Sequence, residues 1–298
     1  MVSLKQLHTF GFDTSAQDLV EINNRDDLIS VFRRVKNKTY YLLGEGSNSI
    51  FLEDFTGTIV LNKLKGIELQ ESDTEFCLSV ASGEPWHELV EYTLSNGVFG
   101  FENLALIPGT VGAAPIQNIG AYGVEIEKFI RSIEYYDIEL NTFNIISHEE
   151  CNFGYRDSIF KRELKGKVII TSVTLQLSTD GKVKTSYKAL SDLVAEKGIL
   201  DPSIQDINDA VKNVSDKNIG KGYFYYGADG KLHESDLTSK MHLKHNTEYG
   251  EYAQVIPTKD LNGDGIVDFL LVKEAFTDSR KTTNNKTGKY FKLTTLLS

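Results

Sequence analysis

Residues 106–123 form a glycine-rich, uncharged segment whose composition suits ligand binding. The segment reads Leu106-Ile-Pro-Gly-Thr-Val-Gly-Ala-Ala-Pro-Ile-Gln-Asn-Ile-Gly-Ala-Tyr-Gly123, with four glycines and two prolines. Glycine lets the backbone approach a ligand closely, and a run of exposed N–H groups favours an anionic phosphate. Its apolar neighbours suit a flat aromatic ring. A tight buried crossover is the alternative, but the length of the segment and the Gln117-Asn118 pair favour a cofactor-binding cradle.

A second glycine-rich segment, Gly44-Glu-Gly-Ser-Asn-Ser49, directly follows the apolar run Tyr40-Tyr-Leu-Leu43. A strand that runs into such a loop is compatible with phosphate binding. The spacing fits neither the Rossmann fingerprint nor a Walker loop, which also requires a lysine. Taken alone, this loop is more often a hairpin turn than a ligand site.

A third segment, Cys151-Asn-Phe-Gly-Tyr-Arg-Asp-Ser-Ile-Phe160, groups Tyr155, Arg156, Asp157 and Ser158. An adjacent Arg–Asp pair is usually a surface salt bridge. Beside aromatic residues and a glycine, however, an arginine can hold a carboxylate or stabilise negative charge that develops on a substrate.

Alternating helices and strands must position these segments. Asn24 can cap a helix whose face carries Leu28, Val31, Phe32 and Val35. Further helices are expected at 86–96 with Pro85 in the first helical position, at 187–196, and after Asp201, a candidate cap followed by Pro202. Strands are expected at 40–43, 50–52, 58–61, 76–81, 132–138, 142–146 and 168–177, with a turn at 54–57 and a short helix or turn at 124–129.

Composition indicates a globular protein. The chain has 298 residues, 40% hydrophobic and 25% charged, which suits one large or two to three small domains. A formal net charge of -10 argues against general nucleic-acid binding but leaves room for a local basic pocket. The two cysteines form no disulfide or metal pattern, and neither a signal peptide nor a long apolar run is present. We therefore expect a soluble, cytoplasmic protein.

Five separated segments resemble the UDP-N-acetylenolpyruvoylglucosamine reductase family, in its shorter-loop type. They occur in the family's order and spacing, and the likeness extends over residues 9–214. The segments are Thr9-Phe-Gly, Leu43-Gly-Glu-Gly-Ser-Asn48, Glu102-Asn-Leu-Ala-Leu-Ile-Pro-Gly-Thr-Val-Gly112, Pro115-Ile-Gln-Asn-Ile-Gly-Ala-Tyr-Gly123 and Phe153-Gly-Tyr-Arg-Asp-Ser-Ile-Phe160.

The resemblance implies an α+β fold, a two-lobed FAD-binding module of the vanillyl-alcohol-oxidase (PCMH) type. Lobe 1 would span residues 1–65 and lobe 2 residues 66–200, followed by an atypical, β-rich region at 201–298. In this family NADPH reduces FAD, and the flavin reduces the enolpyruvyl ether of a UDP-sugar to UDP-N-acetylmuramate for peptidoglycan. We also expect a monomer that binds neither membrane nor nucleic acid.

The resemblance assigns roles to particular residues. Arg156 matches the catalytic arginine, which stabilises an enolate, and Tyr155 and Tyr187 lie where the family contacts substrate. The predicted FAD-binding residues are Gly44, Glu45, Gly46, Ser47, Asn48, Ser49, Pro108, Gly109, Thr110, Gly112, Gln117, Asn118, Ile119, Gly120, Ala121 and Tyr122.

The sequence after Val214 departs from the family. The family continues with a third domain that contains a catalytic serine in a glycine-rich segment and a catalytic glutamate, and neither motif is found here. A natural fusion, a misassembled reading frame and a diverged third domain all fit. The alternatives to an active reductase are an FAD-binding remnant that lacks the proton donor and, less well supported, an oxidase of the same flavin superfamily.

Residues 260–268 of this region carry a pattern of their own. Asp260, Asn262, Asp264 and Asp268 supply oxygen atoms at near-alternate positions with Gly265 between them, like the first half of a calcium loop. Position 271 is a leucine, so the bidentate glutamate of an EF-hand is absent. Flanking strands are expected at 254–256 and 269–272. A Ca²⁺ loop and a plain Asp/Gly turn fit equally well.

Overall fold

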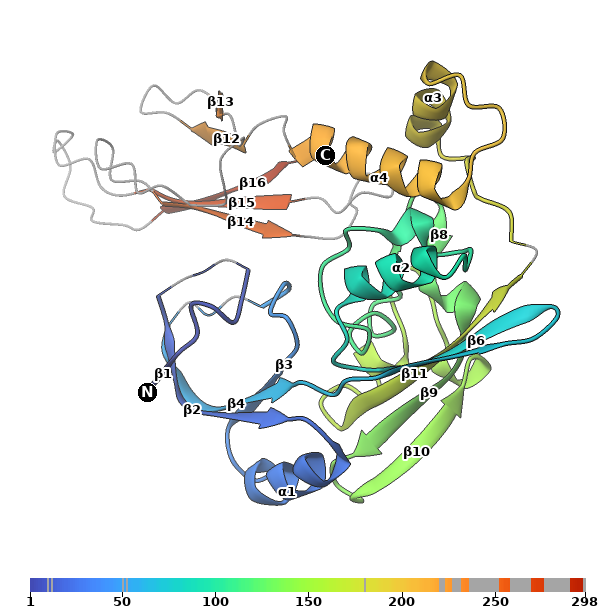
Figure 1. The fold of residues 1–298 in the computed structure, drawn as a ribbon. Coiled ribbons are helices and arrows are strands. Elements are labelled where there is room, and N and C mark those ends of the chain that lie inside the picture. Colours follow the sequence, from blue (N-terminus) through green and yellow to red (C-terminus); the bar gives the residue numbers. More distant parts are fainter. Residues whose placement is uncertain are drawn as a thin grey trace, which may run out of the picture. The chain divides into compact units, whose positions relative to one another are not determined.

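The computed structural model describes residues 1–219 except 10, 12, 50, 52 and 180, and five later strand segments at 223–226, 232–235, 252–257, 269–275 and 290–296. The chain divides into two compact units, Met1–Lys212 and Asn213–Ser298. The three glycine-rich and arginine-containing segments all belong to the first unit, which contains two larger sheets and one short two-stranded sheet (Figure 1).

The first sheet has the strand order β1-β2-β4-β3. Its strands are β1 (Val2–Ser3), β2 (Ser15–Ile22), β3 (Tyr40–Leu43) and β4 (Phe55–Asn62). Strand β4 lies between β2 and β3 and pairs with both in parallel. Parallel neighbours require crossover connections rather than hairpins, so the Gly44–Ser49 loop is part of a crossover, not a hairpin turn.

Helix α1 (Arg25–Val35) is the crossover between β2 and β3, and its sequence explains its limits. The Asn24 side chain accepts a hydrogen bond from the Asp27 N–H, as predicted for the cap. Acidic residues in the first turn and Arg33 and Arg34 in the last complement the helix dipole.

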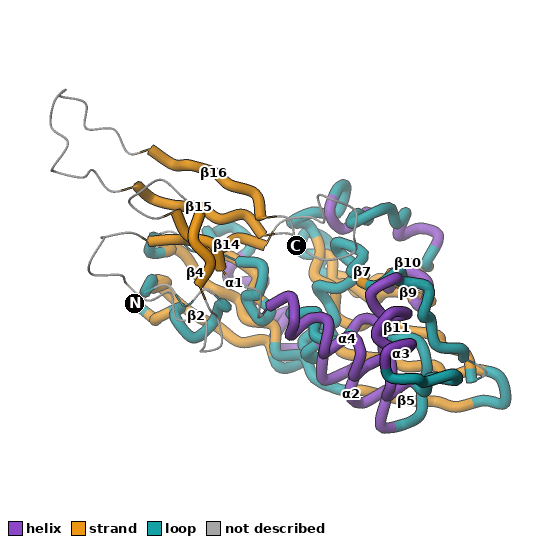
Figure 2. Tube along the Cα trace, turned by 90° about the horizontal axis from the view of Figure 1, so that it is seen from above, coloured by secondary structure: helices purple, strands orange, loops and turns teal. Residues whose placement is uncertain are grey.

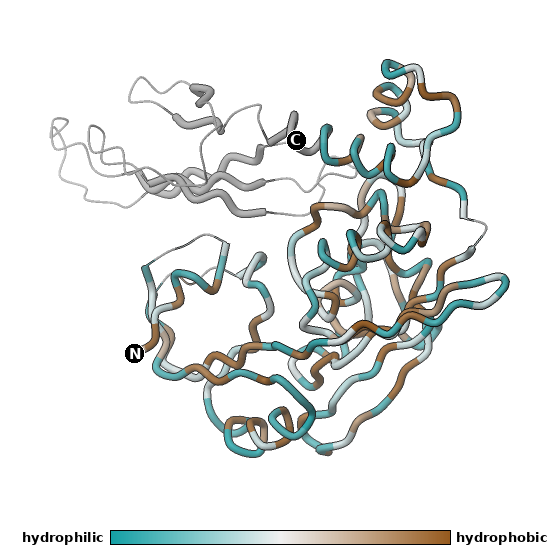
Figure 3. The backbone as a smooth tube through the Cα atoms, viewed as in Figure 1, coloured by the Kyte–Doolittle hydropathy of each residue, from teal (hydrophilic) through white to brown (hydrophobic). Residues whose placement is uncertain are grey.

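The second sheet is antiparallel, with the order β10-β9-β11-β6-β5. Its strands are β5 (Ile67–Glu71), β6 (Glu75–Ala81), β9 (Ile130–Asp137), β10 (Thr142–Ser147) and β11 (Val168–Ser178). The central strands β6 and β11 are largely apolar, whereas the turn between β5 and β6 is hydrophilic (Figure 3). This difference follows burial, because β11 has a strand on each side and the turn faces solvent.

Short elements connect the sheets to the candidate site. They are α2 (Trp86–Ser95), β7 (Gly120–Ala121), β8 (Val124–Glu125), α3 (Lys188–Glu196), α4 (Ile204–Ile219) and the 3₁₀ helices Glu102–Leu104, Ile126–Phe129, Glu149–Cys151 and Ile159–Lys161. Helix α4 lies beside α2 (Figure 2), where Lys212 Nζ donates to Glu91 Oε1 at 2.7 Å.

The strands described in the second unit form two antiparallel groups. β12 (Tyr223–Tyr226) pairs with β13 (Leu232–Ser235), and β15 (Phe269–Ala275) lies between β14 (Tyr252–Pro257) and β16 (Tyr290–Leu296). The strands predicted at 254–256 and 269–272 are therefore confirmed. The calcium-like segment 260–268 lies outside the described residues, and its Ca²⁺ ligands stay a prediction.

Three local predictions were wrong. Phe55–Gly57 belongs to β4 rather than to a turn, because Phe55 pairs with Ala16 of the neighbouring strand. Phe51 is in no strand; its buried ring packs edge-on against Phe55 instead. Pro85 is the cap of α2 rather than its first residue, with an extended backbone at ψ 132°.

The start of α4 also differs from the prediction. The helix begins at Ile204 rather than directly after a cap at Asp201. The Ser203 hydroxyl accepts from the Asp206 N–H at 3.2 Å, and the Asp206 carboxylate accepts from the Ser203 N–H at 2.9 Å. This reciprocal capping box satisfies two backbone donors at once, which a single Asp201 side chain cannot do.

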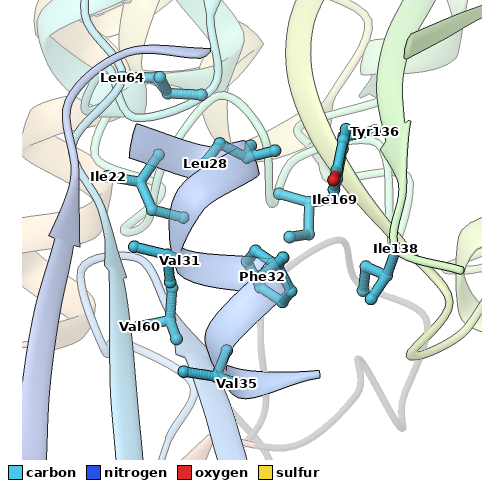
Figure 4. Packing of buried hydrophobic residues seen from close by; sticks show 10 residues of the cluster. All are labelled: Ile22, Leu28, Val31, Phe32, Val35, Val60, Leu64, Tyr136, Ile138 and Ile169. Atoms are coloured by element: carbon cyan, nitrogen blue, oxygen red, sulfur yellow. The ribbon is translucent and has the colours of Figure 1, made fainter. Parts of the chain in front are cut away.

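One apolar cluster connects the two sheets of the first unit. Phe32 of α1 is fully buried and lies with its ring 6.4 Å from that of Tyr136 on β9 (Figure 4). The cluster comprises Ile22, Leu28, Val31, Phe32, Val35, Val60, Leu64, Tyr136, Ile138 and Ile169. Helix α1 therefore fixes the first sheet against the second by apolar burial.

Truncation of Phe32 tests this connection. Phe32→Ala should lower the free energy of unfolding by ~3–5 kcal/mol, because it removes a buried ring and leaves a cavity between the sheets. The matched control is Ile145→Ala at a position that is 72% exposed on β10, where the change should stay within about 0.5 kcal/mol. Urea denaturation measures both; equal effects would contradict this account of the core.

Candidate functional site

The glycine-rich segment at 106–123 is held against the loop that precedes α2. The N–H of Val111 donates to the Glu84 carbonyl at 2.8 Å, and the Gly109 carbonyl accepts from the Trp86 N–H at 2.8 Å. Backbone groups of the segment thus form hydrogen bonds to this loop, whereas in a regular strand they would pair with a neighbouring strand. They hold the segment at the start of α2 although it forms almost no helix or strand.

The loop Gly44–Ser49 of the first sheet meets this segment directly. Glu45 Oε2 accepts a hydrogen bond from the Gly109 N–H at 2.9 Å. A Cβ added at Gly109 would lie 3.3 Å from Ser47 Oγ, and Gly109 has a φ of +112°. Two residues that are 64 positions apart in the sequence thus bring the two predicted cofactor-binding segments into direct contact.

Gly46 explains how the first loop fits. It has a φ of +68°, and a Cβ there would lie 2.1 Å from the Leu7 carbonyl oxygen. Any other residue would therefore push the loop away from the N-terminal segment. The Gly46 carbonyl also accepts from the Thr9 N–H at 3.3 Å, so the Thr9 segment and this loop form one unit.

Asn118 connects the glycine-rich segment to the arginine-containing loop. It is fully buried, and its Nδ2 donates to the Gly154 carbonyl at 3.1 Å. Its Oδ1 accepts from the Glu127 N–H at 3.1 Å. Because a buried amide left unpaired costs about 1–3 kcal/mol, these partners fix the segment, the 3₁₀ helix and the loop relative to one another.

The guanidinium of Arg156 is held by the same segment. Its Nη1 donates to the Asn118 carbonyl at 3.1 Å, and its Nη2 donates to the Gly120 carbonyl at 2.5 Å. Nη1 also forms an ion pair with Glu125 Oε1 at 3.2 Å. The Arg156 side chain is only 13% exposed, so its positive charge is partly shielded from water beside the cradle.

Backbone strain gathers in the same two segments. Non-glycine residues with a positive φ are uncommon and mark candidate functional sites. Of the six such residues in the described part of the chain, five lie in residues 106–123 or in the loop at 152–156. These five are Leu106, Asn118, Tyr122, Asn152 and Arg156.

Each of the two predicted substrate tyrosines contacts a residue of this region. The Tyr187 ring packs edge-on against that of Tyr122, with centroids 5.2 Å apart. Asn103 connects Tyr122 to the chain just before Tyr187, because its Nδ2 donates to the carbonyls of Tyr122 and Lys184. Tyr155 is 59% exposed, and the Arg156 guanidinium lies 5.1 Å from its ring centroid.

The structure therefore brings together residues that the sequence only places in order. The Gly44–Ser49 loop, the Pro108–Tyr122 segment, Arg156 and Tyr187 are connected by the contacts above. Asn48 is exposed and Gln117 half-buried. The cofactor-binding, substrate-binding and catalytic roles of all these residues stay predictions. No group of three or more His, Cys, Asp or Glu side chains in the described residues could hold a metal ion.

Sequence reasoning did not single out Glu125, and it placed Glu102 in a family-like segment without giving it a role. Burial raises the pKa of Glu125, and the negative charge of Glu127 acts in the same direction. The positive charge of Arg156 opposes them. Glu102 is 2% exposed and accepts from the Gly100 N–H at 2.7 Å. The sequence did offer one indication for Glu125. It lies two residues after Gly123, and a short hairpin at that glycine would bring it back to Gly120.

Gly120 provides a direct test of the contact with Arg156. A Cβ at this position would lie 2.8 Å from Arg156 Nη1 and 2.7 Å from the Val124 carbonyl oxygen. Gly120→Ala should therefore lower the free energy of unfolding by ~1–3 kcal/mol, as overpacking does.

The matched control is Gly154→Ala, whose Cβ would lie 3.8 Å from that of Asp157. This variant should be unchanged or slightly more stable, because alanine restricts the unfolded chain. Urea denaturation measures both variants. A Gly120→Ala protein as stable as the control would contradict the close packing of Arg156 on Gly120.

The buried Glu102 gives a pH-dependent prediction. Burial raises the pKa of Glu102, against the lowering effect of the N–H groups of Gly100 and of Glu102 itself. The folded protein thus retains this proton to a higher pH than the unfolded chain, so this contribution to stability is present at low pH and lost as pH rises through the raised pKa.

Glu102→Gln lacks this titration. The free energy of unfolding of the wild type should fall relative to that of Glu102→Gln as pH rises above the ordinary carboxyl range, and then level off. Denaturation curves over a pH series measure the difference. A difference that does not vary with pH would contradict the assignment.

Comparison with known proteins agrees with this geometry. Residues 16–139 match a family described as an FAD binding domain. The UDP-N-acetylenolpyruvoylglucosamine reductase of Pseudoalteromonas translucida is 49% identical over 193 residues, or 65% of this chain and 56% of that protein. The reductase of the same name from Pseudoalteromonas atlantica is 47% identical over 212 residues, or 71% of this chain and 60% of that protein.

A solved structure shares the fold. The UDP-N-acetylenolpyruvylglucosamine reductase of Thermus caldophilus aligns with a TM-score of 0.52 at 22% identity, over 77% of this chain and 75% of that one. The predicted α+β, two-lobed FAD-binding fold is confirmed.

The chain spans little more than half the length of the two curated relatives, and the matched part is about two thirds of the chain. Within that part, identity of nearly half the residues accompanies a matching domain and the contacts between its separated motifs. Over this part, the chain is similar to the UDP-N-acetylenolpyruvoylglucosamine reductases at 47–49% identity and contains a matching FAD binding domain.

Proposed function

We propose that this protein binds FAD and uses NADPH to reduce UDP-N-acetylglucosamine enolpyruvate to UDP-N-acetylmuramate, a peptidoglycan precursor. The observation that supports this most directly is the Arg156 guanidinium held on the carbonyls of Asn118 and Gly120. It places a cation beside a backbone cradle of small residues. An anionic substrate reduced next to a cofactor requires this combination.

The residues present fit the cofactor. The cradle contains Gly109, where a Cβ would come within 3.3 Å of Ser47 Oγ, so the absence of a side chain lets the two glycine-rich segments approach each other closely. In this proposal the loop Gly44–Ser49 and the segment Pro108–Tyr122 bind the pyrophosphate and the ring of FAD. When bound, FAD supplies the hydride that it receives from NADPH.

The chain's own residues provide orientation and charge. Arg156 stabilises the negative charge that develops on the substrate, as electrostatic catalysis requires. Tyr155, beside Arg156, and Tyr187, beside Tyr122, contact the substrate. The Asn118 side chain keeps the arginine loop and the glycine-rich segment together, so that the guanidinium does not have to reorganise during the reaction.

We also propose a monomer in the cytoplasm that binds UDP-sugar and NADPH but no nucleic acid or membrane. The formal charge of -10 disfavours a polyanionic partner. In the described residues no helix has the length and apolarity needed to cross a bilayer.

Steady-state assay of the purified protein tests the function. The protein should be yellow, and it should oxidise NADPH only when the enolpyruvyl UDP-sugar is supplied, with UDP-N-acetylmuramate as the product detected by mass spectrometry. A yellow protein that leaves this sugar unchanged would instead be a flavin-binding protein without reductase activity. A colourless protein that takes up no FAD would contradict the whole proposal.

Arg156→Lys tests the role of the guanidinium. Lysine keeps the positive charge but loses the planar donor fork, so kcat should fall by about 10²–10³-fold, as after loss of one oxyanion donor. FAD content should not change. The matched control is Arg34→Lys in the last turn of α1, which should retain full activity; equal kcat values for both variants would contradict the assignment of Arg156.

A further inference from the structure

Arg156 receives its only carboxylate partner in the described residues from Glu125. The ion pair between Nη1 and Glu125 Oε1 measures 3.2 Å, and the same nitrogen donates to the Asn118 carbonyl. Glu125 is 27% exposed and Arg156 13% exposed, so both charges are partly removed from water. An ion pair shielded in this way fixes orientation better than one on the open surface.

The position of Glu125 follows from the hairpin of β7 and β8. Glu125 pairs with Gly120 across this hairpin, and Gly120 is the residue whose carbonyl accepts from Arg156 Nη2. A carboxylate and a carbonyl on opposite strands of one short hairpin therefore hold the two terminal nitrogens of one guanidinium. This arrangement restricts both the place and the plane of the group.

We infer that Glu125 is a positioning residue that fixes the guanidinium of Arg156 for its charge-stabilising role. The inference rests on the proposed function for its kinetic consequences, but the positioning itself is a property of the chain. Glu125 does not react; it acts through Arg156.

The surroundings of Glu125 give the positioning a pH dependence. The charged groups that face its carboxylate are Arg156 from the 152–158 loop and Glu127 and Lys128 from the 3₁₀ helix. Burial and Glu127 raise the pKa of Glu125, against the effect of Arg156 and Lys128. As pH falls through this raised pKa, Glu125 becomes neutral and the ion pair with Arg156 is lost.

Two substitutions separate charge from shape. Glu125→Gln keeps an acceptor oxygen near Nη1 but removes the charge, whereas Glu125→Ala removes both. In the FAD-loaded protein, kcat should fall about tenfold in Glu125→Gln and about 10²-fold in Glu125→Ala, because misplacement of an orienting group by an ångström costs that much. Glu125→Asp should recover part of the loss, and FAD content should remain that of the wild type.

The pH profile distinguishes positioning from a purely structural role. The wild type should lose activity on the acidic side as Glu125 is protonated, and this limb should be absent from Glu125→Gln. The control is Glu91→Gln, which removes the ion pair with Lys212 between α2 and α4; it should keep the wild-type kcat and profile. An unchanged kcat in Glu125→Ala, or an acidic limb retained in Glu125→Gln, would overturn the inference.

Chemical modification tests the positioning without requiring activity. Phenylglyoxal reacts with guanidinium groups, and peptide mass spectrometry follows Arg156 individually. The modification rate of Arg156 should rise several-fold in Glu125→Ala and remain at the wild-type value in Glu91→Gln. If the wild type has no reductase activity, this rise would still support the positioning while the proposed function fails; an unchanged rate would overturn the positioning itself.

Discussion

The structure of the candidate site depends on the interactions of the Arg156 guanidinium. Two backbone carbonyls accept hydrogen bonds from it, and one carboxylate forms an ion pair with it. The carbonyls belong to Asn118 and Gly120, which lie more than thirty residues earlier in the chain. This contact is possible only because Gly120 has no Cβ and because Asn118 and Arg156 adopt positive φ angles. Such a conformation costs on the order of 1–3 kcal/mol at a residue, so surrounding contacts must enforce it.

Those contacts come from both sheets of the first unit. The second sheet carries β10 and β11, between which the arginine loop lies in the chain, and the glycine-rich segment is held by the loop at 82–86. The first sheet supplies the Gly44–Ser49 loop through Glu45, which accepts from the Gly109 N–H. The apolar cluster around Phe32 keeps the two sheets together and so preserves the distance between these loops.

Much of this organisation could be predicted from local sequence patterns. The capped helix α1, the hairpin of β9 and β10 and the long strand β11 follow from apolar periodicity and turn residues. The glycine-rich segments were identified from composition, and the family resemblance placed Arg156 near them. These features are predictable because each is encoded within a few neighbouring residues.

Features that depend on contacts between distant residues could not be predicted in this way. The parallel pairing of β3 with β4 is invisible in either strand alone, so the loop after β3 resembled a hairpin turn. Helix α4 begins after the capping box of Ser203 and Asp206 rather than after the predicted cap Asp201. Glu125 had no recognisable motif, because its role arises only when the β7–β8 hairpin brings it to Arg156.

The most direct measurement of the central claim observes the two halves of the reaction separately, by anaerobic stopped-flow absorbance of the FAD-loaded protein. NADPH should bleach the flavin band, and addition of the enolpyruvyl UDP-sugar should restore it, with restoration slowed about 10²–10³-fold in Arg156→Lys. A flavin band that remains bleached after the sugar is added to the wild type would contradict the account.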